Sequence, residues 1–259
     1  MNFTSEVKKG SKMKEVSLFL LFLSLLYGCA SHSPPQGAGA EEMYAWACRK
    51  LEGGDTEEAI AGFKRLIFEH PGSEYLDDAR FGLAEAYYKQ GDHILATSEY
   101  KGLIRDFPSS PFADDSQYKA ALCYFKLSPR PQLDQNYTYQ AIEEFKVFLE
   151  EYPQSRLVPQ AKQRLGQLRN KLAEKAYRNG LLYYKMGDYQ AARIYYRIVL
   201  EEYGETDWVD DAHYGLGEIW EKEGEKDEAL KEYRMIPHHF PYGNCARKAL
   251  EKIRRLSSG

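Results

Sequence analysis

Apolar residues follow the 3.6-residue period of an amphipathic helix from Glu41 almost to the end of the chain. Short turns interrupt this pattern and separate a first helix from a second, at Gly54, Gly91, Gly187 and Gly224. The interval from Gly54 to Gly91 is 37 residues, and the interval from Gly187 to Gly224 is again 37. A helix-turn-helix unit that recurs at a fixed interval predicts an array of repeats.

Each second helix carries the same two packing positions, a small residue and an aromatic ring four residues later. The small residues are Ala59, Ala96, Ala141, Ala192 and Ala229, and the rings are Phe63, Tyr100, Phe145, Tyr196 and Tyr233. Residues four apart share a helix face, so the small residue lets two helices approach closely and the ring fills the gap. A proline ends most of these helices, because it lacks the N–H that a helix needs. These stops are Pro71, Pro108, Pro153 and Pro241, with Gly204 in the remaining place.

These marks recur in register over about 41–241 and are those of the tetratricopeptide repeat (TPR), with its unit of about 34 residues lengthened by about three. We therefore predict an all-α fold, a right-handed solenoid of five TPR units with a C-terminal capping helix. An ordinary helical bundle is the alternative, but it gives no reason for several positions to recur together.

The array is expected to be uneven in its middle. N-terminal units occupy 41–127, and a loop at 128–137 lies inside the third unit, because two prolines there forbid a continuous helix. The C-terminal units occupy 138–241 and include one long joining helix of about 25 residues, since the apolar period continues there without a break. Residues 242–259 form the capping helix, with apolar residues on one face and basic residues elsewhere.

The N-terminus has the features of a lipoprotein signal peptide, residues 1–28. Four lysines precede an apolar run that is shorter than the about 20 residues needed to span a bilayer. The run ends in Leu-Tyr-Gly-Cys, which resembles a bacterial lipobox, so Cys29 is the expected lipidation site. Residues 29–40 then form the lipidated N-terminus and a flexible tether. An ordinary cleaved signal is the alternative, and either Met1 or Met13 is the true start.

Composition and motifs exclude several classes of function. A net charge of −4 and a pI near 5.9 leave no basic field for nucleic acid. No catalytic constellation or phosphate loop is present, and the six histidines are scattered. The cysteines other than the lipidation site are Cys48, Cys123 and Cys245, without the spacing of a disulfide framework or a zinc site. We therefore expect no enzyme activity, no cofactor and no metal.

The first helices of the units are where a TPR array lines its inner groove. Alignment by the turns places a ring at one equivalent position and an acid three residues earlier, on the same helix face. The rings are Tyr44, Phe81, Tyr118, Tyr177 and Tyr214, and the acids are Glu41, Asp78, Asp115, Glu174 and Asp211. We take those of the first three units, together with Tyr88, as groove candidates for an extended peptide. Alternatively the rings pack against neighbouring helices and the acids cap helix starts; the sequence leaves both open.

Five stretches are more specific than the repeat itself. They are LSPRP at 127–131, AIEEF at 141–145, YPQS at 152–155, LRNKLAEK at 168–175 and YYKMGDYQAA at 183–192. In these stretches the chain resembles the BamD-like family, repeat lipoproteins of the outer-membrane β-barrel assembly machinery. The resemblance implies a non-enzymatic, lipid-anchored protein on the periplasmic face of the outer membrane. It also implies three kinds of partner: unfolded outer-membrane proteins at the N-terminal units, the periplasmic domains of the barrel-forming subunit at the C-terminal units, and other assembly lipoproteins.

One position departs from the family pattern. The family often has an arginine that helps dock the partner in the fourth unit, and the matching residue here is Tyr195. Arg193 and Arg197 flank it and are the expected substitutes, so these three residues are the docking candidates. An adaptor of the cell envelope that coordinates peptidoglycan synthesis or pilus and secretion assembly is the alternative function.

Overall fold

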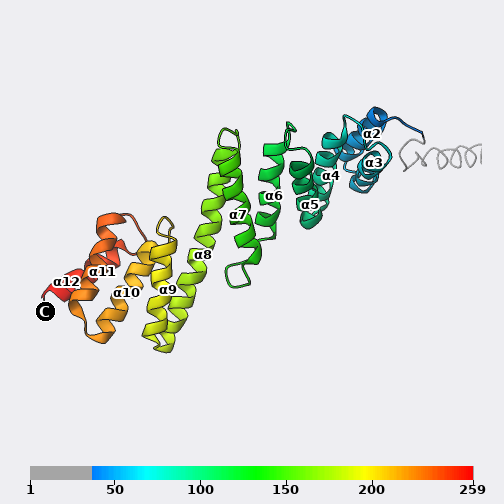
Figure 1. The fold of residues 1–259 in the computed structure, drawn as a ribbon. Helices are drawn as coiled ribbons and strands as arrows, with labels where there is room; N and C mark the ends of the chain where they lie inside the picture. The colour runs from blue at the N-terminus through cyan, green and yellow to red at the C-terminus, as the bar shows by residue number, and fades with distance from the viewer. Residues whose placement is uncertain (1–36, 259) are drawn as a thin grey trace, which may run out of the picture. The chain divides into compact units, whose positions relative to one another are not determined.

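The computed structural model describes residues 37–258. Within this range every regular element is a helix, and none of these helices is long and apolar enough to cross a membrane. The helices (Figure 1) are α2 (Ala40–Gly53), α3 (Thr56–Glu69), α4 (Leu76–Gln90), α5 (His93–Asp106), α6 (Ala113–Leu127), α7 (Asn136–Glu151), α8 (Val158–Met186), α9 (Tyr189–Glu202), α10 (Val209–Glu223), α11 (Lys226–His239) and α12 (Ala246–Ser258). The predicted signal peptide, Cys29 and most of the tether lie outside the described residues.

The chain divides into two compact units, one that ends at Gln90 and one that begins at Gly91. In the first, α3 packs against both α2 and α4. In the second, consecutive helices from α5 to α12 pack against one another. Helices that contact their sequence neighbours are the mark of a repeat array, and four of the predicted pairs, α2–α3, α6–α7, α8–α9 and α10–α11, each lie within one compact unit. The all-α TPR class is confirmed, and the handedness of the solenoid stays a prediction.

The turns inside the pairs show why the sequence breaks its helices where it does. Gly187 has φ 82°, a left-handed conformation that a residue without Cβ adopts at little cost. The N–H of Gly187 donates to the carbonyl of Tyr184 at 3.1 Å, and the N–H of Asp188 donates to that of Tyr183 at 3.0 Å. The Asp188 carboxylate then accepts the N–H of Ala191 at 3.0 Å and caps α9. This one turn therefore provides hydrogen-bond partners for backbone carbonyls at the end of α8 and for a backbone N–H at the start of α9.

The predicted pairs of small residue and ring form the core. All five alanines are fully buried, and none of the five rings is more than 1% exposed. Tyr196 shows how tight this packing is, because its ring lies against Gly180 of α8 on one edge and Gly215 of α10 on the other. The interpretation of these positions as close helix contacts is confirmed.

The loops between pairs share a serine turn that the sequence analysis did not identify. The hydroxyls of Ser73, Ser110 and Ser155 accept the N–H groups of Tyr75, Phe112 and Leu157 at 3.1–3.2 Å. Each bond fixes the approach to the next helix, as side-chain caps at loop positions do. The sequence does carry this pattern, because in each loop a serine stands two residues after the proline that ends the helix.

Candidate interaction surfaces

In the first compact unit, which ends at Gln90, three predicted groove residues lie where the starts of α2 and α4 meet. The Tyr44 hydroxyl donates to the Asp78 carboxylate at 3.5 Å, and the Tyr44 ring stacks on Tyr75 with 5.4 Å between centroids. Beside this pair is an open cleft of about 660 Å³, which Glu41, Glu74 and Tyr75 help to line. Of the predicted residues, Glu41 lines the cleft itself, while Tyr44 and Asp78 lie behind Tyr75, a lining residue that the sequence analysis missed.

The cleft is acidic. Burial raises the pKa of Tyr75, and the carboxylates of Glu41, Glu74 and Asp78 raise it further. Burial also raises the pKa of Asp78. Carboxylates beside stacked rings are suited to accept N–H groups or cationic side chains from an extended segment whose apolar parts lie on the rings.

The other groove candidates of the first unit lie further along α4. Phe81 and Tyr88 are half-buried, and both already interact with other groups of the protein. They add partly exposed ring surface to α4 but do not line the cleft.

In the second unit, the expectation of an open ring at Tyr118 requires correction. Tyr118 is 8% exposed, because it packs edge-on against Phe145 and Phe148 of α7, at 5.8 and 5.7 Å between centroids. Asp115, three residues earlier, pairs with Arg156 at 3.2 Å. Tyr118 is thus a core residue and Asp115 is engaged in an ion pair, so the packing alternative holds for this pair.

The docking candidates lie on α9 in three different environments. Arg193 is 14% exposed and pairs with Glu223 of α10 at 2.7 Å, with its guanidinium 4.2 Å above the ring of Trp220. Tyr195 stacks on Tyr183 of α8, with 5.5 Å between centroids and 8° between planes. Arg197 is exposed. Arg193 therefore holds α9 to α10, while Tyr195 and Arg197 reach the surface.

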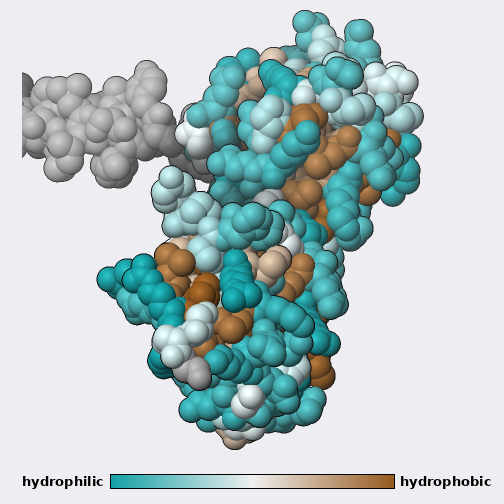
Figure 2. Space-filling model, turned by 90° about the vertical axis from the view of Figure 1, so that its left-hand side faces the viewer, coloured by the Kyte–Doolittle hydropathy of each residue, from teal (hydrophilic) through white to brown (hydrophobic). Residues whose placement is uncertain are grey.

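Three exposed apolar residues that the sequence analysis missed lie next to the Tyr183–Tyr195 stack in sequence, because Leu182 precedes Tyr183, Met186 follows it by three residues and Ile194 precedes Tyr195. Leu182 is 55% exposed, Met186 is 69% exposed and Ile194 is 61% exposed. The face shown in Figure 2 is mostly hydrophilic, and hydrophobic side chains reach it in separate places. We call Leu182, Met186 and Ile194, with the stacked tyrosines, the α8–α9 patch. The available signal was the spacing of Leu182 and Met186, which places them on one face of α8 away from its buried residues Ala176 and Gly180.

Comparison with known proteins decides the family. The sequence model of the family described as YfiO, outer membrane lipoprotein, matches residues 37–235. This chain belongs to the YfiO outer membrane lipoprotein family. The predicted resemblance is thereby confirmed.

The curated relatives of this YfiO-family chain carry one name. The outer membrane protein assembly factor BamD of Xylella fastidiosa strain 9a5c is 29% identical over 242 residues, 87% of this chain and 82% of that protein. BamD of Caulobacter vibrioides is 25% identical over 227 residues, 86% of this chain and 74% of that protein.

Solved structures of similar arrangement are TPR proteins. A thermophilic TPR protein of Thermus thermophilus is 19% identical, with 85% of this chain and 98% of that chain covered and a TM-score of 0.36. The TPR2AB domain of yeast Sti1 is 15% identical, with coverage of 85% and 83% and a TM-score of 0.45.

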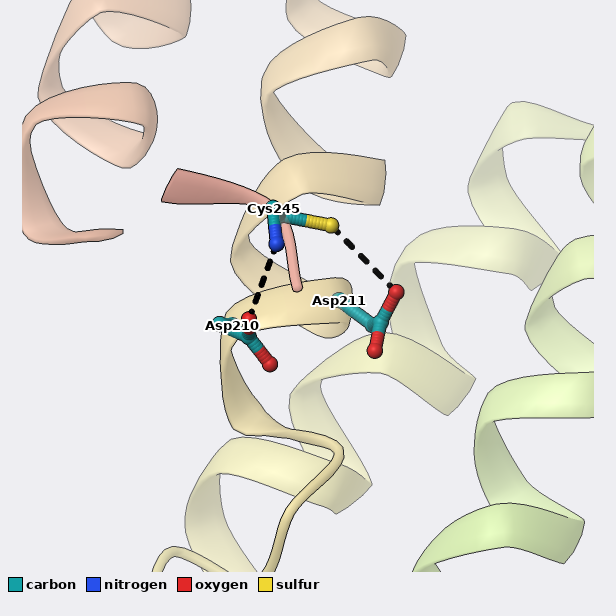
Figure 3. A group of neighbouring side chains, drawn as sticks. All are labelled: Asp210, Asp211 and Cys245. Carbon is teal, nitrogen blue, oxygen red and sulfur yellow. Dashed lines mark hydrogen bonds between the residues drawn. The ribbon is translucent and has the colours of Figure 1, made fainter. Parts of the chain in front are cut away.

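Cys245, just before α12 and beyond the matched range, lies beside two acids at the start of α10, Asp210 and Asp211 (Figure 3). The N–H of Cys245 donates to Asp210 at 3.1 Å, and its thiol donates to Asp211 at 3.3 Å. Burial raises the pKa of Cys245 to about 12, so the thiol keeps its proton at neutral pH. Gly243 occupies the place of the serine in this loop, and Asp210 accepts the N–H that the serine would accept. We therefore assign this group to holding α12 in place.

Proposed function

We propose that this protein is a lipid-anchored, non-catalytic adaptor on the periplasmic face of the outer membrane, where it assists the assembly of β-barrel proteins. The observation that carries the proposal is that relatives named as outer membrane protein assembly factors align with 87% of this chain. Two surfaces of different chemistry support it, an acidic aromatic cleft in the first unit and the apolar α8–α9 patch in the second. Their chemistry suits two different partners.

The cleft of the first unit is the proposed site for segments of unfolded outer-membrane proteins. Such segments are extended and alternate apolar with polar side chains, since they become strands of a barrel. Tyr44 and Tyr75 offer ring surface to the apolar side chains, and Glu41 and Glu74 accept backbone N–H groups or cations. Phe81 and Tyr88 on α4 are proposed to extend the contact.

The α8–α9 patch is the proposed dock for the periplasmic domains of the barrel-forming subunit. Leu182, Met186 and Ile194 are each more than half exposed on neighbouring helices, and apolar side chains that gather on a surface often mark a site of protein contact. Arg197 is exposed one turn after Ile194 on α9, and Tyr195 contributes a ring rather than the family's arginine. Other assembly lipoproteins are further proposed partners of the protein.

The test is a pull-down from solubilised membranes with the tagged mature protein, followed by binding to the purified periplasmic domains. We expect recovery of the barrel-forming subunit, and loss of most of it with Leu182→Ser/Met186→Ser. Leu250→Ser is the matched control, because Leu250 is 42% exposed on α12, away from the patch. Recovery of peptidoglycan-synthesis, pilus or secretion proteins without a barrel-assembly subunit would refute the proposal.

The cleft is tested separately with peptides from the ends of outer-membrane proteins. Glu41→Gln/Glu74→Gln and Phe81→Ala are expected to weaken binding, measured by fluorescence anisotropy. Phe68→Ser is the control, since Phe68 is 84% exposed on α3 and does not line the cleft. Unchanged affinity in both variants would remove the cleft from the proposal and leave the docking patch standing.

A further inference from the structure

We propose that the docking surface of the α8–α9 patch continues onto the loop 128–135, and that both contact one folded partner domain with an apolar centre and an acidic rim. The inference rests on the proposed docking function and extends it to a second element. It also gives a role to two of the five specific stretches of the sequence, LSPRP at 127–131 and LRNKLAEK at 168–175.

The loop is held rigid from within by Gln135. The side chain of Gln135 is 3% exposed, and its amide donates to the carbonyls of Arg130 at 2.8 Å and Leu133 at 3.0 Å. Its amide oxygen accepts the hydroxyl of Thr138 at 2.7 Å, and that hydroxyl lies 2.6 Å from the hydroxyl of Ser128. Buried polar groups that are satisfied in this way fix one conformation of the loop.

Two lysines of α8 hold the loop from outside. The Lys171 ammonium donates to the Ser128 carbonyl at 3.3 Å and to the Ser128 hydroxyl at 2.7 Å. The Lys175 ammonium donates to the carbonyls of Pro131 at 3.1 Å and Leu133 at 2.7 Å. Burial lowers the pKa of Lys171, as expected for an ammonium enclosed by a loop. The loop is therefore attached to α8 at two successive turns.

The same face of α8 leads from the loop to the α8–α9 patch. At about 100° per residue, positions 171, 175, 182 and 186 fall within about 60° of one another around the helix. Seven residues separate Lys175 from Leu182, which is a rise of about 10 Å, and Met186 follows about 6 Å further. Leu133, whose carbonyl Lys175 holds, thus stands in line with Leu182 and Met186.

The loop presents an apolar side chain on a rigid backbone. The side chain of Leu133 is 58% exposed, while the backbone carbonyls of Leu133 and Pro131 are both held by hydrogen bonds from Lys175. At the next turn Tyr137 is 38% exposed and stacks on Tyr124, with 6.3 Å between centroids. A preformed apolar element loses little conformational entropy when a partner covers it, which favours binding.

The charges around this surface define the partner. Arg130 of the loop, Lys185 beside Met186 and Arg197 of α9 carry positive charge at or near the surface. Two acids lie in or beside this surface, Asp134 in the loop and Asp188 in the turn after α8, and each accepts a backbone N–H, from Asn136 at 2.9 Å and from Ala191 at 3.0 Å. A partner with apolar side chains at its centre and carboxylates around them is complementary to this arrangement. Along α8, about 16 Å separate Lys175, which holds the loop, from Met186, and the partner's apolar surface must span about this length.

The experiment measures the affinity of the mature chain for the purified periplasmic domains of the barrel-forming subunit by calorimetry. Leu182→Ser tests the patch, Leu133→Ser tests the loop, and Leu250→Ser is the control for a lost exposed leucine. We expect each of the first two to weaken binding about fivefold or more, and the control to change it less than about twofold. Lys171→Met/Lys175→Met should also weaken binding and should speed amide hydrogen exchange in 128–135 while the helix content stays unchanged.

The outcomes separate the inference from the function on which it rests. If Leu182→Ser weakens binding and Leu133→Ser does not, the docking function stands and the extension to the loop is overturned. If the wild-type chain does not bind the domains at all, the docking function itself fails. If light scattering shows a dimer that Leu133→Ser dissociates, the loop contacts a second copy of this chain and the inference is overturned.

Discussion

Two glycines in α8 predict opposite effects of the same substitution. Gly180 is buried, and a Cβ there would lie 2.6 Å from Cε1 and 2.7 Å from Cδ1 of Tyr196. The ring cannot retreat, because a Cβ at Gly215 on its other edge would already lie 2.6 Å from Cε2. Gly166 is exposed in the same helix, and a Cβ there would meet nothing within 4 Å.

The magnitudes follow from these distances. Alanine in place of glycine inside a helix stabilises it by about 0.5–1 kcal/mol, and this gain applies to both positions. Forcing an extra carbon into a tight core costs about 1–3 kcal/mol, and this cost applies to Gly180 alone. We therefore expect Gly166→Ala to stabilise the protein and Gly180→Ala to be about 1–3 kcal/mol less stable than Gly166→Ala.

Urea unfolding followed by far-ultraviolet circular dichroism measures the two free energies. A double-mutant cycle with Tyr196→Leu adds a second criterion, because a smaller side chain relieves the contact and should recover about 1 kcal/mol or more of the loss. Equal stabilisation by both alanines, or no coupling to Tyr196, would refute the close contact.

Three further predictions concern ionisable groups of the second unit. Burial, with Lys126 nearby, lowers the pKa of His93. The neutral imidazole therefore contributes its full stabilisation above about pH 6.5, and this contribution is lost as the pH falls through the lowered pKa. His93→Gln should flatten the fall in melting temperature below about pH 6.5. Because burial raises the pKa of Cys245 to about 12, alkylation at pH 8 followed by mass spectrometry should be slow in the folded chain and fast in urea; fast labelling of the folded chain would contradict this. Asp210→Ala should cost about 1–3 kcal/mol and speed hydrogen exchange at the start of α12, since the N–H of Cys245 loses its acceptor; an unchanged exchange rate would contradict the cap.

The repeat positions were predictable because they depend on local spacing. The alanine and ring four residues apart, such as Ala192 and Tyr196, mark a helix contact whatever lies further along the chain. Contacts between distant residues were not predictable in this way. Arg193 has the family's chemistry near the expected position, yet its ion pair with Glu223 and its contact with Trp220 are made on another helix. Its enclosure therefore depends on tertiary packing that no single-helix pattern records.

The groove candidates also show that a pattern within one helix does not determine which side chains are exposed. A ring and an acid three residues apart fit both a binding groove and a packed core, and the structure divides them by position. Tyr44 stacks on Tyr75, which lines an open cleft, whereas Tyr118 is covered by Phe145 and Phe148 of α7. Exposure is set by which neighbour covers a helix face. The exposure of Leu182 was not predicted either, because it depends on the absence of a helix over that face of α8.

Helix α8 has a consequence for how the protein unfolds. In most repeat arrays one unit can fray while its neighbour stays folded. Here 29 residues, about 43 Å of continuous helix, pack against α7 as well as α9. Melting the third pair would expose the first turns of α8, and melting α9 would expose its last turns. The third and fourth pairs therefore behave as one cooperative block, and a chain truncated between them loses both.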